Sequence, residues 1–166
     1  MECIRFSFYA KLNSLKNGAK MQVKFYDTID DKLLKFAVIV SMAEDKWVFC
    51  KHKERCTFEV PGGHREHGET ILDAAKRELR EETGAKDFSI KPVCVYSVTG
   101  KNRLNGTGEE TFGMLYFAEI TSFEKELHSE MEKVCLFEKL PAEWTYPQIQ
   151  PKLIEESARR GFCKLS

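Results

Sequence analysis

Residues 62–85, GGHREHGETILDAAKRELREETGA, decide how the rest of the sequence is interpreted. The stretch opens with a glycine turn and continues as a helical segment that carries Glu78, Glu81 and Glu82. At about 100° per residue, these carboxylates fall on one side of a helix. Like charges at i,i+4 destabilise a helix, and a pair at ~5 Å with an effective dielectric near 20 repels by about 3 kcal/mol. The segment therefore needs compensating positive charge.

Two sources of that positive charge are available. Arg77 can offset part of the repulsion through Glu81. A hard divalent cation such as Mg²⁺ or Mn²⁺ would relieve the rest, because carboxylate oxygens are its preferred ligands. The plainer interpretation of an arbitrary acidic helix is a solvated surface. The residues that surround this helix decide between the two.

The surrounding residues follow the spacing G-x5-E-x7-R-E-U-x-E-E-x-G-U, in which U is aliphatic. Every fixed position is matched, by Gly63, Glu69, Arg77, Glu78, Leu79, Glu81, Glu82, Gly84 and Ala85. A chance match is on the order of one in a billion per starting position. On these residues the chain resembles the Nudix hydrolase family, and the preceding E-V-P-G resembles that family's lead-in. The resemblance implies an α/β fold, an α/β/α sandwich with a mixed central sheet.

The resemblance also implies a chemistry. Nudix hydrolases cut the pyrophosphate of a nucleoside diphosphate that is linked to a further group X, and they use Mg²⁺, with Mn²⁺ as a substitute. The metal ligands that it implies are Glu78, Glu82, Glu81, Glu69 (directly or through water) and the backbone carbonyl of Gly62. Glu78 is also the expected base, and Arg77 is expected to hold the carboxylates. We expect the Glu78 and Glu82 side chains to face solvent and metal rather than the core.

Some roles stay open. Relatives sometimes take the base from outside the motif, and the candidates here are Glu109, Glu110, Glu130, Glu132 and Glu143. His64 stands where MutT-type relatives often carry lysine. His64 and His67 either contact phosphate or are exposed loop histidines.

The group X is the harder question. Trp144 and Tyr146, just before the last predicted helix, either stack on a nucleobase or pack that helix against the sheet. Side features resemble the MutT-type branch, which includes 8-oxo-dGTP diphosphatases. We therefore expect a (d)NTP such as 8-oxo-dGTP to be cut to the NMP and pyrophosphate. The alternatives are ADP-ribose, a dinucleoside polyphosphate or capped RNA as substrate, or a non-catalytic ligand sensor, against which the intact carboxylates argue.

Composition sets the remaining expectations. The 166 residues predict a single domain over 21–166, with 1–20 either an N-terminal extension or an extra strand. Lys plus Arg and Asp plus Glu number 26 each, which disfavours duplex nucleic acid or a membrane surface as partner. No apolar run is long enough to span a bilayer. Six cysteines without a C-x-x-C pair predict reduced thiols and a cytoplasmic protein. The sequence does not reveal the oligomeric state, and the family resemblance leaves monomer or homodimer open.

Periodicity predicts the elements. Strands are expected over residues 21–27, 33–42, 46–50, 57–60, 88–98, 111–120 and 133–137. Helices are expected from Thr70 to Gly84 and over 147–160. In the strand 111–120, one face is expected to carry Phe112, Met114, Tyr116, Ala118 and Ile120, and the other Leu115 and Phe117. Such two-sided burial is typical of a central strand between helical layers.

Overall fold

The structure is a computed structural model that describes residues 21–101, 105–124 and 131–165. The two alternatives for residues 1–20 lie outside these ranges. Among the described cysteines, Cys50, Cys94 and Cys163 are free thiols. Cys56 is disulfide-bonded, so the expectation that all thiols are reduced is wrong at this position.

A mixed sheet forms the centre of the fold. Its strands are β1 (Gln22–Tyr26), β2 (Leu34–Ala43), β3 (Lys46–His52), β4 (Gly62–His64), β5 (Ala85–Thr99), β6 (Thr111–Phe123) and β7 (Met131–Phe137). The order across the sheet is β1-β5-β6-β2-β3-β7, and β4 also pairs with β2. The β2–β6 pair is parallel, whereas β1–β5, β5–β6 and β2–β3 are antiparallel. The predicted mixed sheet is confirmed.

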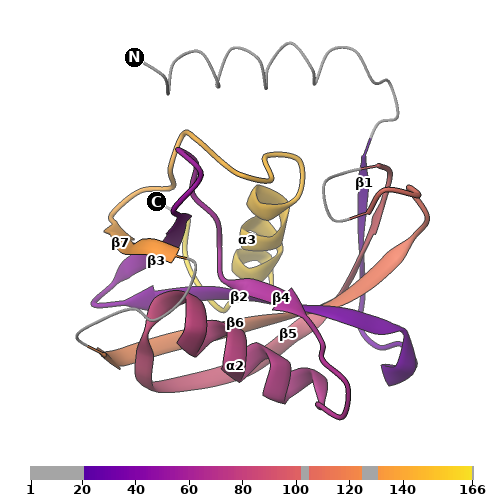
Figure 1. Ribbon diagram of the computed structural model, residues 1–166, viewed down its shortest axis with the longest axis horizontal. Helices are drawn as coiled ribbons and strands as arrows, with labels where there is room; N and C mark the ends of the chain where they lie inside the picture. Colours follow the sequence, from indigo (N-terminus) through magenta and orange to yellow (C-terminus); the bar gives the residue numbers. More distant parts are fainter. Residues whose placement is uncertain (1–20, 102–104, 125–130, 166) are drawn as a thin grey trace.

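Two helices cover the two faces of this sheet, as Figure 1 shows. Helix α2 (Ile71–Thr83) packs on one face and α3 (Gln150–Arg159) on the other, while the short 3-10 helix η1 (Asp31–Leu33) precedes β2. Each helix closes a separate hydrophobic cluster, with Leu79 of α2 in one and Leu153 of α3 in the other. The α/β/α sandwich is therefore confirmed. Among the described residues, neither helix is long and apolar enough to cross a membrane.

Strand β6 has the two faces that alternation predicts. Phe112, Met114, Tyr116, Ala118 and Ile120 belong to the cluster under α2, whereas Leu115 and Phe117 belong to the cluster under α3. A strand buried on both sides has no polar face, so its apolar residues follow one another without interruption.

Two local predictions are wrong. Residues 57–60 do not form a strand but only the isolated bridges Cys50–Glu59 and Phe58–Trp144. The Phe58 N–H donates to the Glu143 carbonyl and the Thr145 N–H donates to the Phe58 carbonyl, while Glu59 exchanges two backbone hydrogen bonds with Cys50 of β3. The segment thus divides its pairing between a loop and β3 and forms no continuous ladder. Helix α3 begins at Gln150 rather than at residue 147, although Gly161, with φ 84°, follows it as predicted.

The glycine turn at the start of the motif is itself a strand. Gly62, Gly63 and His64 form β4, which pairs with Val38, Ala37 and Phe36 of β2. A Cβ at Gly62 would lie 2.5 Å from the Ala37 carbonyl oxygen, closer than real Cβ atoms come to backbone. Because Gly62 has no side chain, β4 can lie against β2. The backbone of β4 then lies next to α2.

Candidate active site

Helix α2 is fixed at both ends by the residues that the sequence suggests. The Asp73 N–H donates to the Thr70 hydroxyl at 3.1 Å, and that hydroxyl donates to the Asp73 carboxylate at 2.6 Å. Gly84 ends the helix in the left-handed region with φ 68°, and its N–H donates to the Arg80 carbonyl at 2.8 Å. Ile71, Ala75 and Leu79 are buried against the sheet. The register of the acidic residues relative to β4 is thus set by caps and core together.

Arg77 lies at the centre of the acidic cluster. Its Nε donates to Glu69 Oε1 at 2.7 Å, and its Nη1 donates to Glu78 Oε1 at 2.8 Å and to Glu81 Oε2 at 3.2 Å. Its Nη2 donates to the His64 carbonyl at 3.0 Å, which joins the helix to β4. The hydrogen bond from Arg77 holds the pKa of Glu69 below its usual value. The guanidinium therefore connects three carboxylates that would otherwise repel one another.

Glu82 and Glu78 carry buried charge. The Gly62 N–H donates to Glu82 Oε2 at 2.8 Å. Burial raises the pKa of Glu82 to about 8 despite that hydrogen bond, and the charges of Glu78, Glu59 and Glu81 add to the rise. Burial also raises the pKa of Glu78, although Arg77 opposes it. Glu82 is thus only partly exposed: it lines the cleft, as expected of a side chain outside the core, while its carboxylate lies against the β4 backbone.

The donor set suits a divalent cation, although the side chains are not arranged around one. Within the described ranges, no three Asp, Glu, His or Cys side chains gather tightly enough to hold an ion as they stand. The guanidinium of Arg77 binds Glu78 and Glu81, while Glu82 turns to the Gly62 amide. The carboxylates nevertheless outnumber this guanidinium, and two of them have raised pKa values because they are desolvated. Oxygen donors with uncompensated negative charge are what Mg²⁺ and Mn²⁺ bind.

These carboxylates open onto a cleft of about 460 Å³ on the α3 side of the sheet. Glu78 and Glu82 line it, and its apolar lining residues come mainly from β2, β5 and α3. The residues that line the cleft include Phe36, Val38, Glu59, His64, Tyr96, Val98, Tyr146, Ile149, Gln150 and Leu153. A cleft of this size, with an apolar part and many polar and charged groups such as Arg55, Glu59 and Asn105, can hold a polar small molecule.

Not every candidate reaches the cleft. Tyr146 and His64 line it, whereas Trp144 packs edge-on against Phe49 with ring centroids 5.3 Å apart. Glu110 accepts hydrogen bonds from Ser97 at 2.7 Å and from Tyr26 at 3.1 Å and is not among the lining residues.

The four other proposed bases lie apart from the cleft or outside the described part of the chain. Glu109 and Glu143 are exposed and do not line the cleft. The remaining two, Glu130 and the Glu132 side chain, lie outside the described part of the chain.

Two cleft residues were missed by the sequence reasoning. Glu59 is 6% exposed and accepts from Arg55 Nη1 with both oxygens, at 3.0 and 3.1 Å. Gln150 is 5% exposed and lines the cleft from the first turn of α3. A signal for Gln150 was present, because it shares the helix face of Leu153 and Ile154 and is a polar residue in an apolar stripe.

The comparisons with known proteins agree with this geometry. The family model for the NUDIX domain matches residues 32–157, which include β2, the acidic helix and most of α3. The chain belongs to the Nudix family. It is a Nudix hydrolase, an enzyme that acts on phosphorus-containing anhydrides.

Individual relatives of this Nudix hydrolase come from bacteria. The Bacillus subtilis (strain 168) protein YtkD, provisionally named an 8-oxo-dGTP diphosphatase, is 33% identical over 122 residues, 73% of each chain. A variant of the B. subtilis pyrophosphohydrolase BsRppH has a TM-score of 0.70 and 27% identity, over 87% of this chain and 93% of that one. A NUDIX hydrolase from Nitrosomonas europaea has a TM-score of 0.61 and 22% identity, over 76% and 89% of the two chains.

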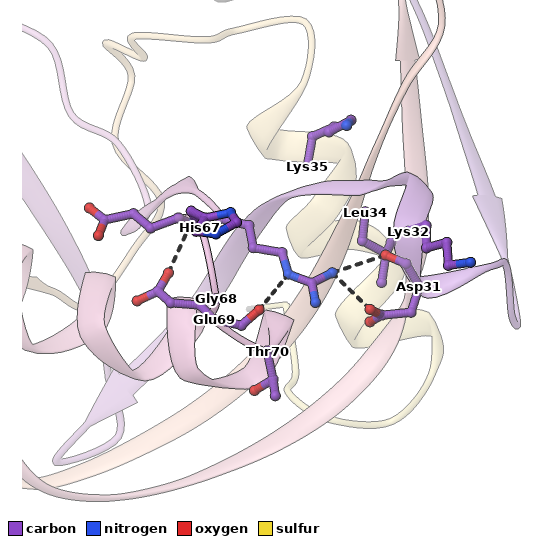
Figure 2. A pocket seen from close by; sticks show the side chains of 10 residues that line it. Asp31, Lys32, Leu34, Lys35, His67, Gly68, Glu69 and Thr70 are labelled. Carbon is purple, nitrogen blue, oxygen red and sulfur yellow. Dashed lines mark hydrogen bonds and ion pairs between the residues drawn. The ribbon is translucent and has the colours of Figure 1, made fainter.

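Arg65 is not one of the fixed positions of the Nudix motif, but it contacts Glu69, which is one. Figure 2 shows an open groove with Asp31 on one wall and Glu69 with Thr70 on the other. Arg65 spans it: Nε donates to the Glu69 carbonyl at 2.7 Å, and Nη1 donates to the Asp31 carbonyl at 3.0 Å and carboxylate at 2.8 Å. Arg65 therefore fixes the backbone of Glu69, whose side chain binds Arg77.

Replacing Arg65 with glutamine is expected to lower kcat by about 10-fold, because residues that support metal-binding side chains commonly carry effects of about 10- to 100-fold. Steady-state kinetics with metal titration would measure this. Lys35→Gln is the matched control, since Lys35 is exposed on the same groove and the substitution removes the same charge. Equal effects of the two substitutions would mean that Arg65 acts only through its charge.

Proposed function

We propose that this Nudix hydrolase cleaves a nucleoside triphosphate, 8-oxo-dGTP or another oxidised purine nucleotide, to the monophosphate and pyrophosphate in the presence of Mg²⁺ or Mn²⁺. The observation that carries the proposal is the pair of desolvated carboxylates, Glu78 and Glu82, in the lining of a cleft of about 460 Å³. The identity to YtkD supports the choice of nucleotide. We also propose that the enzyme works in the cytoplasm, as monomer or homodimer.

The residues have separate tasks in this proposal. Glu78, Glu81 and Glu82, with Glu69 and the Gly62 carbonyl, would hold the metal, which when bound neutralises phosphate charge and acidifies water. Glu78 takes a proton from the attacking water, whose oxygen bonds to a phosphorus of the pyrophosphate as the bridging P–O bond breaks. Arg77 keeps the Glu78 carboxylate in place.

The other proposed roles are contacts between cleft residues and the substrate. His64 and Tyr146 both line the cleft, and we propose that His64 meets phosphate and Tyr146 contacts the base. Trp144, which lies outside the cleft lining, stays a prediction.

A substrate panel with product identification tests this proposal. The panel contains dNTPs, 8-oxo-dGTP, ADP-ribose, a dinucleoside polyphosphate and capped or 5′-triphosphate RNA. Monophosphate plus pyrophosphate from 8-oxo-dGTP, at the highest kcat/KM of the panel, is the expected result. A higher kcat/KM for ADP-ribose or RNA would overturn the choice of nucleotide. Tight binding without turnover of any member would indicate a ligand sensor.

Adding Mg²⁺ or Mn²⁺ to the metal-free protein is expected to raise its Tm. A ligand that binds only the folded state stabilises it by about 2.7 kcal/mol at 100 times its Kd. Glu82→Gln should shrink this rise, because the substitution removes a buried charge that the ion would neutralise. Thermal unfolding with and without EDTA measures the effect, with Glu155→Gln, an exposed carboxylate on α3, as the matched control. A metal response that is unchanged in Glu82→Gln would contradict the ligand assignment.

A further inference from the structure

Arg55 brings a positive charge into the lining of the cleft, where it is tied to a buried carboxylate. Its Nη1 donates to both carboxylate oxygens of Glu59, at 3.0 and 3.1 Å. The Glu59 side chain is 7% exposed, whereas that of Arg55 is 26% exposed. The Nε and Nη2 groups of Arg55 donate to no residue that the structure describes. The guanidinium is therefore fixed at one nitrogen, is partly accessible and has donors left for a ligand.

The backbone holds this ion pair beside the acidic cluster. Glu59 exchanges two hydrogen bonds with Cys50 of β3, and the Arg55 N–H donates to the His52 carbonyl at 3.1 Å. Burial is the main cause of the raised pKa of Glu82, and the negative charge of Glu59 adds to the rise, so these two carboxylates lie near one another. Arg55, Glu59 and Glu82 all line the same cleft. A ligand held at the carboxylates through a metal ion would thus also meet a guanidinium.

A guanidinium beside a metal-binding cluster suits the phosphate that the metal does not neutralise. The terminal phosphate of a triphosphate has three non-bridging oxygens and carries more than one negative charge. The planar fork of an arginine matches such a group in both shape and charge. In ADP-ribose both phosphates are esterified, and each carries a single charge. An arginine that binds a terminal phosphate therefore favours a triphosphate over a pyrophosphate diester.

We infer that Arg55 is a specificity-determining residue, which binds the terminal phosphate of a nucleoside triphosphate from the position that Glu59 gives it. The inference rests on the proposed function, because it takes a triphosphate to be the substrate. The terminal phosphate departs in the pyrophosphate, so this contact selects the leaving part of the substrate and not its base. If Arg55 only neutralised Glu59, its loss would lower stability without changing the choice of substrate.

Arg55→Gln by itself would leave the Glu59 carboxylate buried without its partner, so a lower Tm is expected. The test is therefore made in protein that carries Glu59→Gln, because a neutral amide at that position can still accept from Nη1. In this background, Arg55→Gln should lower kcat/KM for 8-oxo-dGTP and dGTP by about 10- to 100-fold, the range of a lost hydrogen bond to a charged group. The value for ADP-ribose should stay nearly the same.

Lys53→Gln is the matched control for the loss of one positive charge. Lys53 is exposed in the same segment and is not among the residues that line the cleft. The substitution should leave kcat/KM for the triphosphates and for ADP-ribose close to the values of the parent protein. An effect of Lys53→Gln as large as that of Arg55→Gln would mean that only the net charge of the segment matters, which would overturn the inference.

Binding of inorganic tripolyphosphate and of ADP-ribose in the presence of Mg²⁺, measured by calorimetry, separates this inference from the proposed function. If the wild type hydrolyses no nucleotide but binds tripolyphosphate, and Arg55→Gln weakens only this binding by about 10-fold or more, the proposed hydrolysis fails and the inference stands. Equal losses for tripolyphosphate and ADP-ribose, or no loss for either, would overturn the inference even if triphosphates are hydrolysed.

Discussion

Glu78→Gln and Glu82→Gln are each expected to lower kcat by at least ~100-fold, the scale of a lost general base or charge-stabilising group. Glutamine keeps the shape of each side chain and removes the charge that binds metal and accepts a proton. Glu78 is 12% exposed and bonded to Arg77, so the variant side chain has little freedom to move elsewhere. Single-turnover measurements with saturating metal and nucleotide would isolate the chemical step.

The same variants should remain folded. Burial raises the pKa of Glu78 and of Glu82, which means that the charged forms destabilise the metal-free protein, and a neutral amide relieves this. Glu119→Gln on the exposed side of β6 is the control for loss of one carboxylate. Rates near the wild-type value in both Glu78→Gln and Glu82→Gln, from correctly folded protein, would remove the site assignment.

Gly63→Ala is expected to lower kcat by about 10- to 100-fold without unfolding the protein. A Cβ at this position would lie 2.2 Å from Glu78 Oε1 and 2.5 Å from its Cδ. The obstacle is the end of a flexible side chain, so the fold can accommodate the methyl group, but only if the Glu78 carboxylate moves. Displacement of a reacting group by about 1 Å can cost about 100-fold in rate.

Two other glycines make this test specific. Gly62→Ala would place its methyl group 2.5 Å from the Ala37 backbone oxygen, where β2 and β4 must separate, so a lower Tm is expected. A Cβ at Gly106 would have no atom within 4 Å, so Gly106→Ala should change neither the rate nor the Tm. A Gly63→Ala variant with full activity would show that the Glu78 carboxylate is not needed where it lies.

The parts of the structure that the sequence predicted depend on local order. Thr70 and Gly84 mark the ends of α2 because capping chemistry acts within a few residues. The two faces of β6 follow from alternation alone. In contrast, β4 is Gly-Gly-His, which has no apolar pattern, and it becomes a strand only because β2 is beside it. Residues 57–60 alternate like a strand, but their backbone groups find partners at residues 143–145.

The site was predictable to a similar extent. The spacing of the motif named Glu78, Glu81 and Glu82, because residues one turn apart on a helix share a side. It did not reveal that the Glu82 carboxylate turns to the Gly62 amide, which depends on where β4 lies. Nor could spacing distinguish Tyr146, which lines the cleft, from Trp144, which packs on Phe49. Such differences arise from tertiary contacts that one sequence does not display.

The separation of the two hydrophobic clusters by the sheet has an evolutionary consequence. The groups proposed to break the phosphoanhydride are on α2, and one apolar wall of the cleft is on α3. Each helix packs on a different hydrophobic cluster. Substitutions at distant sites without shared partners are close to additive. Over evolution, substitutions on the α3 wall of the cleft could therefore change which nucleotide is bound while the acidic residues of α2 stay the same.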